Sequence, residues 1–287
     1  KAGGSQLHVG VDTLPPLPKD AGDRNRTSPF AFTGNKFEFR AVSSNQTIAG
    51  PLVALNTIVA KSLDEIATEL EKATKGDPKK LNDAVQKLIA DIFKKHKNVI
   101  FNGDGYSEAW HKEAAKRGLP NLRNTVDALP ELLKPEYADM FAKYNVLTKR
   151  ELHSRYEIYT ERYCKDIATE GKVALGLART TILPAAYRYQ GELAKIAAAL
   201  LAAGKKADTS LLDRLTGLVA ELEKGIDTLA HALDHTAKGD VLAHAKHYRD
   251  EVIPGMLAIR KVADELETII ADDTWPLPSY REMLFTK

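Results

Sequence analysis

A helical repeat of apolar side chains dominates the second half of this 287-residue sequence. Thr148 and Glu151 stand in the positions of a capping box, which begins a helical pattern that continues to about Ala203. The last such pattern runs from Asp240 to about Ala271. Between them, apolar residues alternate steps of four and three, the spacing of a coiled-coil seam: Leu211, Leu215, Leu218, Leu222, Ile226, Leu229 and Leu233. Three long apolar-striped helices joined by short glycine-containing turns predict an antiparallel helical bundle.

Proline interrupts two of these helical patterns. Pro184 lies inside the first, and because proline lacks an amide N–H we expect it to kink or break the helix near Ile182. Pro254 interrupts the last pattern in the same way. The tail segment Trp275–Pro278 holds two prolines and is predicted to be non-helical.

Shorter helices are predicted between residues 50 and 144. Pro51 suits a first helical position, Asp77 is a candidate N-cap, and Ser107 caps a short helix that ends at Gly118. Further helices are expected over residues 122–133 and 135–144. The first of these helices is indicated by apolar residues that recur at steps of three and four: Leu52, Leu55, Val59, Leu63, Ile66 and Leu70.

The first 42 residues differ from the rest because they favour strands. Leu7, Val9 and Val11 alternate with other residue types, and Lys36–Arg40 alternates charged with aromatic side chains. Two or three short strands make a marginal sheet, so we expect them to form the edge of a larger sheet whose other strands lie upstream, outside this chain.

The predicted fold class is α+β and predominantly α-helical, with a few strands from the edge of an incomplete sheet, followed by helices and a long antiparallel bundle. We predict three regions: residues 1–74 ending a catalytic domain, 75–147 forming a helical connection, and 148–287 forming the bundle. The start, Lys1-Ala2-Gly3-Gly4, lacks an initiator methionine and suggests the middle of a longer polypeptide.

Composition excludes several classes of protein. The formal net charge is only +2, from 41 basic and 39 acidic residues in mixed order, so we expect neither nucleic acid nor a membrane as a partner. Uninterrupted apolar runs are too short for a membrane span. The single cysteine, Cys164, cannot form an internal disulfide, which fits a reducing compartment, and it is interpreted as a small buried residue rather than a reactive thiol.

Three weaker patterns have both a functional and a structural interpretation. The pairs His231/His235 and His244/His247 have helical spacings that could hold a metal, although surface helices carry such pairs by chance. The glycine-rich segment Asn102–Tyr106 could cradle an anion but lacks the lysine and spacing of a phosphate loop, so a tight connection is favoured. Tyr residues at 156, 159 and 163 could stack on bases, but helix packing is the favoured interpretation.

The segment Lys36–Arg40 holds the strongest candidate chemistry. In a strand, Lys36, Glu38 and Arg40 share one face and two phenylalanines the other. Arg26 lies close in sequence. Guanidinium groups match phosphate oxygens, and a carboxylate beside them suits a divalent cation that bridges phosphates. The residues alone leave two alternatives, a phosphate and metal site or an ion-paired sheet surface.

A family resemblance favours the first alternative. Asn25-Arg26-Thr27-Ser28 followed by Lys36-Phe37-Glu38-Phe39-Arg40 resembles the end of the catalytic domain of glutamine synthetases. The run from Asn25 to Arg40, with Gly50-Pro51 and Leu55–Val59, is similar to the type III branch of that family. Further similar stretches are Asn102–Ser107 and Ser154–Tyr159. The resemblance covers essentially the whole chain.

The resemblance implies an ATP-dependent ligase that forms γ-glutamyl phosphate from glutamate, after which ammonia attacks to give glutamine. By position, Glu38 would be a ligand of one Mg or Mn ion. Arg40 would hold the carboxylate that is phosphorylated and the phosphate that develops on it. Arg26 would contact the ATP phosphates, in the same motif as Asn25, and Lys36 would lie near the nucleotide. Such fixed charges lower the barrier to phosphoryl transfer by electrostatic preorganisation.

Two departures from the family pattern matter. Ala31 stands where commoner branches place a second arginine, so that phosphate contact must come from elsewhere. One carboxylate cannot make a magnesium site, so the partner ligands must lie outside this chain, which we expect to be inactive alone. The resemblance also implies a cytoplasmic homo-oligomer in a large ring. The alternative is a helical scaffold, regulatory or oligomerisation module that keeps the motif only as architecture.

Overall fold

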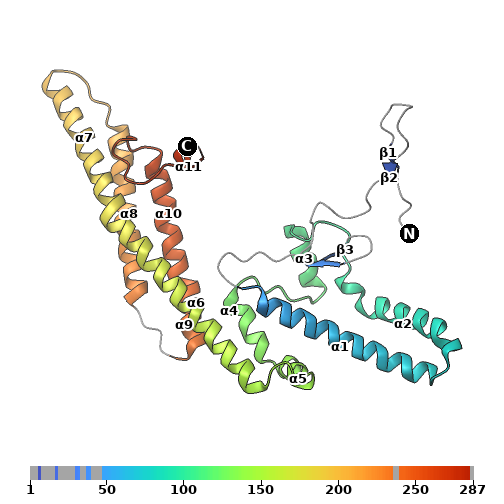
Figure 1. Ribbon diagram of the computed structural model, residues 1–287. Coiled ribbons are helices and arrows are strands. Elements are labelled where there is room, and N and C mark those ends of the chain that lie inside the picture. The colour runs from blue at the N-terminus through green and yellow to red at the C-terminus, as the bar shows by residue number, and fades with distance from the viewer. Residues whose placement is uncertain are drawn as a thin grey trace. The chain divides into compact units, whose positions relative to one another are not determined.

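The computed structural model describes residues 6–7, 17–18, 30–32, 37–39, 47–234 and 239–284 (Figure 1). Before residue 47, only the backbone of the strands is described. The described part is predominantly helical, as predicted. The chain divides into two compact units, one made of residues 1–123 and 140–146 and the other of residues 124–139 and 147–287. The three regions proposed from the sequence stay a prediction.

In the part of the chain that the structure describes, four short strands form two separate antiparallel ladders. Strand β1 (Gln6–Leu7) pairs with β2 (Leu17–Pro18), and β3 (Phe30–Phe32) pairs with β4 (Phe37–Phe39). Both ladders have two strands, which is below the size that is stable alone in water. That these segments belong to the edge of a larger sheet stays a prediction.

The first unit is built on a helical hairpin. Helix α1 ends at Thr74, and the chain reverses through Lys75 and Gly76, which both have positive φ, of 49° and 80°. The Asp77 carboxylate accepts a hydrogen bond from Lys79 N, as its predicted role as a cap requires. The helical elements of this unit are α1 (Ala49–Thr74), η1 (Pro78–Lys80), α2 (Leu81–His96), η2 (Lys97–Val99) and α3 (Glu108–Lys116).

The second unit holds the long helices. The predicted capping box is confirmed: Glu151 N donates to Thr148 Oγ1 (3.2 Å) and Thr148 N donates to Glu151 Oε2 (2.8 Å). The C-terminal end of α5, from Met140, counts with the first unit. The helical elements from residue 124 onward are α4 (Thr125–Ala128), η3 (Leu129–Leu133), α5 (Pro135–Lys143), α6 (Lys149–Leu177), η4 (Ala178–Ile182), α7 (Leu183–Ala202), α8 (Ser210–Asp234), α9 (Val241–His247), η5 (Tyr248–Val252), α10 (Ile253–Glu267) and α11 (Tyr280–Leu284).

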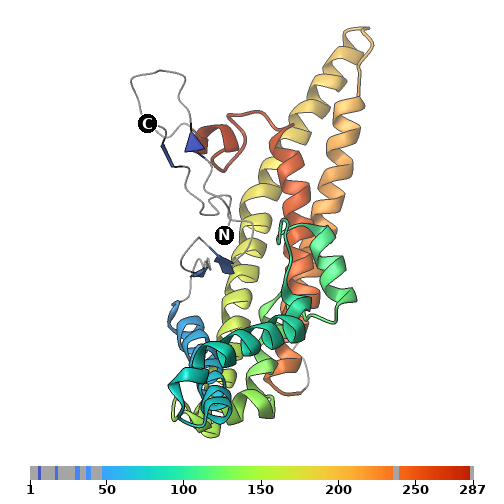
Figure 2. The same ribbon diagram turned by 90° about the vertical axis from the view of Figure 1, so that its right-hand side faces the viewer.

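The core of the second unit is the seam of α8. The predicted seam residues are buried at the five central positions, while Leu211 at one end is exposed and Leu233 at the other is half-buried. Helix α8 returns along α7, and α10 runs beside α8, so that the three long helical segments pack as a bundle (Figures 1 and 2). The buried seam contacts Ile259, Val262 and Leu266 of α10 and Ile182 of η4 in one apolar cluster. None of the described helices combines the length and hydrophobicity that a membrane crossing requires.

Both internal prolines are accommodated without ending the helix. The regular α-helix is interrupted at Ala178–Ile182, as expected near Ile182, but of the two predicted outcomes, a kink or a break, the break does not occur. Each proline follows a π-helical turn, η4 before Pro184 and η5 before Pro254. Leu183 N bonds to Ala178 O and Ile253 N to Tyr248 O, five residues back rather than four. Because a π turn shifts the pairing, it adjusts locally to the N–H that proline lacks while the helix continues. The tail segment Trp275–Pro278 is non-helical, as predicted.

A close approach between α8 and α10 occurs at Gly225. A Cβ added there would lie 3.2 Å from Ile259 Cγ1 and 3.9 Å from Ile259 Cα. We expect Gly225→Leu to lower the free energy of unfolding by about 1–3 kcal/mol relative to Gly217→Leu, because the backbone of α10 cannot move aside by a rotamer change. Gly217 lies on the same helix with no atom within 4 Å of its Cβ position. Urea unfolding of the two variants checks this; equal midpoints would show that the helices separate freely.

Candidate functional site

The residues predicted to form the phosphoryl-transfer site fall mostly where the structure gives no placement. Asn25, Arg26, Lys36 and Arg40 lie outside the described residues. Glu38 is described through its backbone alone, at the centre of β4. The roles assigned to these five residues therefore stay predictions.

The register of β3 with β4 defines the position of Glu38. Glu38 pairs with Ala31, and the flanking register positions pair Phe30 with Phe39 and Phe32 with Phe37. Alternate positions of a ladder belong to opposite faces, so the acidic position and the four aromatic ones are separated. The predicted charged face of Lys36, Glu38 and Arg40 stays a prediction, because Lys36 and Arg40 lie outside the described residues.

The described residues around Glu38 do not make up a complete metal site. The position opposite Glu38 is Ala31, which offers no side-chain oxygen ligand. Among the described residues, no three His, Cys, Asp or Glu side chains lie together as a metal would require. Since Mg²⁺ takes six ligands and is usually held by more than one protein or substrate oxygen, any metal chemistry requires ligands beyond these residues.

The glycine-rich segment before α3 is a tight connection. The Asp104 carboxylate accepts from Tyr106 N (2.9 Å), and the Asp104 carbonyl accepts from Ser107 N (3.2 Å) and Ser107 Oγ (2.8 Å). Ser107 Oγ in turn accepts from Trp110 N (3.2 Å), as its predicted role as N-cap requires. The amides of Tyr106 and Ser107 are therefore already engaged within the segment itself, which favours the structural interpretation over an anion cradle.

An aromatic stack fastens this connection to α3. The Phe101 ring stacks on Trp110 with centroids 4.2 Å apart, and the Arg117 guanidinium lies 5.3 Å from the Trp110 ring. Arg117 Nη1 donates to Ile100 O (2.9 Å), and Arg117 Nε donates to Glu113 Oε1 (2.8 Å), which lowers the pKa of that carboxyl. A Cβ at Gly103 would lie 2.8 Å from Phe101 Cζ, so glycine is required while the stack is in place.

Three other side chains singled out from the sequence, His247, Tyr156 and Cys164, have structural surroundings. His247 Nε2 lies 2.8 Å from the Ala232 carbonyl, and because a carbonyl only accepts, the imidazole donates and links α9 to α8. His235 lies outside the described residues. Tyr156 is buried, which removes it from any base-stacking surface. Cys164 is half-buried, and burial raises the pKa of its thiol, as expected for an unreactive cysteine.

Sequence reasoning missed one polar cluster, in the first unit. Asp64 Oδ2 accepts from Lys143 Nζ (2.8 Å) and from Tyr144 OH (2.7 Å), and Lys143 Nζ also donates to Tyr144 OH (3.2 Å). The Lys143 hydrogen bond lowers the pKa of Asp64, and the Asp64 hydrogen bond raises the pKa of Lys143. Both groups are thus charged at neutral pH and unsuited to proton transfer there. The cluster ties α1 to the end of α5, and no local pattern predicts a contact across 79 residues.

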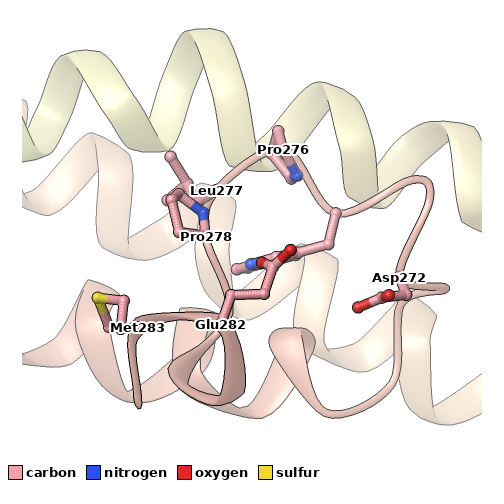
Figure 3. A pocket seen from close by; sticks show the side chains of 7 residues that line it. Asp272, Pro276, Leu277, Pro278, Glu282 and Met283 are labelled. Carbon is pink, nitrogen blue, oxygen red and sulfur yellow. The ribbon is translucent and has the colours of Figure 1, made fainter. Parts of the chain in front are cut away.

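A cavity of about 610 Å³ lies at the C-terminal tail (Figure 3). Its lining mixes the carboxylates of Asp272 and Glu282 with apolar side chains that include Trp275, Leu277 and Met283. Glu282 accepts hydrogen bonds from Ser279 N (2.8 Å) and Ser279 Oγ (3.2 Å). The Glu282 carboxylate is therefore held by hydrogen bonds at the start of α11. None of the residues predicted to be catalytic lines the cavity.

Comparison with known proteins identifies relatives for almost the whole chain. Residues 84–200 match the family described as the glutamine synthetase C-terminal domain. The chain is 37% identical to the type-3 glutamine synthetase of Dictyostelium discoideum over 99% of its own length and 40% of that protein. It is 32% identical to a glutamine synthetase of Bacteroides fragilis, covering 98% of this chain and 40% of the relative. A glutamine synthetase of Butyrivibrio fibrisolvens is 33% identical, over 93% and 38% respectively.

The chain thus spans about 40% of the length of the relatives it matches. The alignment with the Dictyostelium protein extends beyond residues 84–200 to 99% of the chain, so it includes the segment Asn25–Arg40. The chain is therefore related to the type III glutamine synthetases, whose C-terminal domain its residues 84–200 match.

Proposed function

We propose that this chain acts as the carboxy-terminal part of a glutamate–ammonia ligase subunit, which forms glutamine through γ-glutamyl phosphate at the expense of ATP. The observation that carries the proposal is the 37% identity with a type-3 glutamine synthetase along 99% of the chain. Since only 40% of that relative is matched, the activity belongs to a longer subunit. We further propose that the subunit assembles into a cytoplasmic ring of identical subunits.

Within that subunit, the β3–β4 segment would supply one wall of the active site. Glu38 would provide one oxygen ligand to Mg or Mn, and Arg40 would neutralise the glutamate carboxylate and the phosphate that forms on it. Arg26 and Asn25 would hold the ATP phosphates, with Lys36 near the nucleotide. Fixed guanidinium groups stabilise the charge that develops on a transferring phosphoryl group because they need no reorganisation during the reaction.

The test is glutamine formation from glutamate, ammonia and ATP with Mg or Mn. We expect the purified 287-residue chain to form none, because its single carboxylate at β4 cannot hold the metal. The protein translated from the full reading frame that contains this chain is expected to be active. The proposal would be contradicted if the 287-residue chain formed glutamine, or if the full-length protein formed none.

A second candidate function is a helical scaffold without catalysis. The described part favours it in one respect. The α6–α10 bundle has an apolar core of its own and also exposes apolar side chains such as Ile196 and Leu201 near the end of α7. A scaffold has no physical need for Arg26, Glu38 and Arg40 together. Substitution at Glu38 separates the two functions.

A further inference from the structure

The C-terminal tail and the helices of the bundle together line a groove. A second cavity, of about 410 Å³, adjoins the one of about 610 Å³ described above. It continues from the tail to Leu177 of α6 and to Met256 and Ile259 of α10. We call the two cavities the tail groove, because they share four lining residues of the tail: Trp275, Leu277, Pro278 and Met283. Cavities of several hundred Å³ are typical of ligand sites.

The tail groove is acidic as well as apolar. One guanidinium, that of Arg260, lines it together with four carboxylates: Asp264, Glu267, Asp272 and Glu282. Figure 3 shows the Asp272 carboxylate pointing toward that of Glu282. Residues 262–284 hold six acidic residues and one basic residue, in a chain whose net charge is +2. A concave surface with this excess of negative charge attracts cationic ligands and repels anionic ones.

Trp275 adds a hydrogen-bond donor that the described part of the protein leaves unsatisfied. Its Nε1 is buried and has no hydrogen-bond partner among the described residues, and its side chain lines both cavities. An indole N–H only donates, and buried polar groups are nearly always paired, so we expect the acceptor to come from a bound molecule. Because Nε1 is covered, the acceptor can enter only if an exposed lining side chain such as Met283 (55% exposed) turns aside.

We propose that the tail groove binds a peptide segment of a partner protein in which basic and apolar residues alternate. In an extended peptide, alternate side chains point to opposite sides. One row would place lysine or arginine beside the carboxylates of Asp272 and Glu282, and the other would pack on the apolar wall that includes Leu177 and Leu277. A backbone carbonyl would accept from Trp275 Nε1. A peptide carries all three complementary groups at once. The proposal concerns the bundle and does not rest on the proposed function.

The test is isothermal titration of the 287-residue chain with the blocked heptapeptide Lys-Leu-Lys-Leu-Lys-Leu-Lys. We expect saturable binding of this peptide and none of its counterpart with glutamate in place of lysine. The double variant Asp272→Asn/Glu282→Gln is expected to raise the dissociation constant by about tenfold, because two exposed charge pairs are lost. The matched control, Glu221→Gln/Asp227→Asn, changes two exposed carboxylates of α8 outside the groove and should leave the constant unchanged.

Trp275→Phe keeps the aromatic ring and removes the donor, so it is expected to weaken binding of the lysine peptide by about fivefold. Unchanged binding by this variant would overturn the assignment of the peptide carbonyl to Trp275. Urea unfolding midpoints equal to that of the unsubstituted chain show that each variant is folded.

Four outcomes would overturn the peptide site itself. The lysine peptide could fail to bind, or it could bind the Asp272→Asn/Glu282→Gln variant as tightly as the unsubstituted chain, which would place it elsewhere. Lysine amide that binds as tightly as the heptapeptide would mean that the groove takes a small cation. Self-association of the chain that the Asp272→Asn/Glu282→Gln variant abolishes would mean that a second copy fills the groove.

Discussion

Replacing Glu38 by alanine in the full-length protein is expected to lower metal-dependent glutamine formation by about 100-fold or more. Removing a residue that merely supports a metal ligand commonly costs 10–100-fold, and in the proposed function Glu38 would itself be a ligand. The loss of activity should be partly relieved by raising the Mg or Mn concentration, because the remaining ligands would still bind the metal ion, only more weakly. Steady-state assays over a metal titration, with native mass measured in parallel, check this.

The matched control for Glu38→Ala is Glu69→Ala. Glu69 is an exposed residue of α1 whose carboxylate forms an ion pair with Lys72 (2.9 Å). Because exposed ion pairs contribute little to stability, removing this carboxylate should leave turnover unchanged. If Glu38→Ala is as active as this control while the assembly stays intact, the scaffold function is the better account. If the assembly is lost as well, Glu38→Gln, which keeps the side-chain volume, separates metal binding from folding.

The largest effect on stability is expected from Leu222→Ala in α8. Leu222 is 0% exposed at the centre of the apolar cluster that joins α8, α10 and η4. Truncation removes buried methyl groups and leaves a cavity, which costs about 2–5 kcal/mol. That is a large fraction of the ~5–15 kcal/mol by which domains are typically stable. Urea unfolding followed by far-UV circular dichroism measures the change in the free energy of unfolding.

Leu257→Ala provides the reference for this measurement. Leu257 has the same side chain on a neighbouring helix of the bundle but is 60% exposed, so its truncation should change stability by less than about 0.5 kcal/mol. Similar unfolding midpoints for the two variants would mean that the α8 seam is not the core of this unit.

Local interactions explain why much of the helical structure was predictable. The capping box at Thr148, the cap at Ser107 and the seam around Leu222 each depend on residues within one or two helical turns, so they can be read from spacing alone. The family was likewise recognisable from Asn25–Arg40, because a short run of chemically demanding residues has few alternatives. The three-dimensional site around Glu38 was not predictable, because the residues of one strand do not determine which residues from elsewhere complete the site.

The sequence by itself determined where the long helices lie, which face of α8 forms the core, and which family the chain resembles. Only the tertiary structure decided that the helices continue through Pro184 and Pro254 by π turns, and that Asp64 meets Lys143. It also decided that the apolar repeat of α1 is exposed at Leu52, Val59 and Leu63. The physical reason is that periodicity specifies an apolar face, whereas the surface that covers this face depends on contacts between residues far apart in the chain.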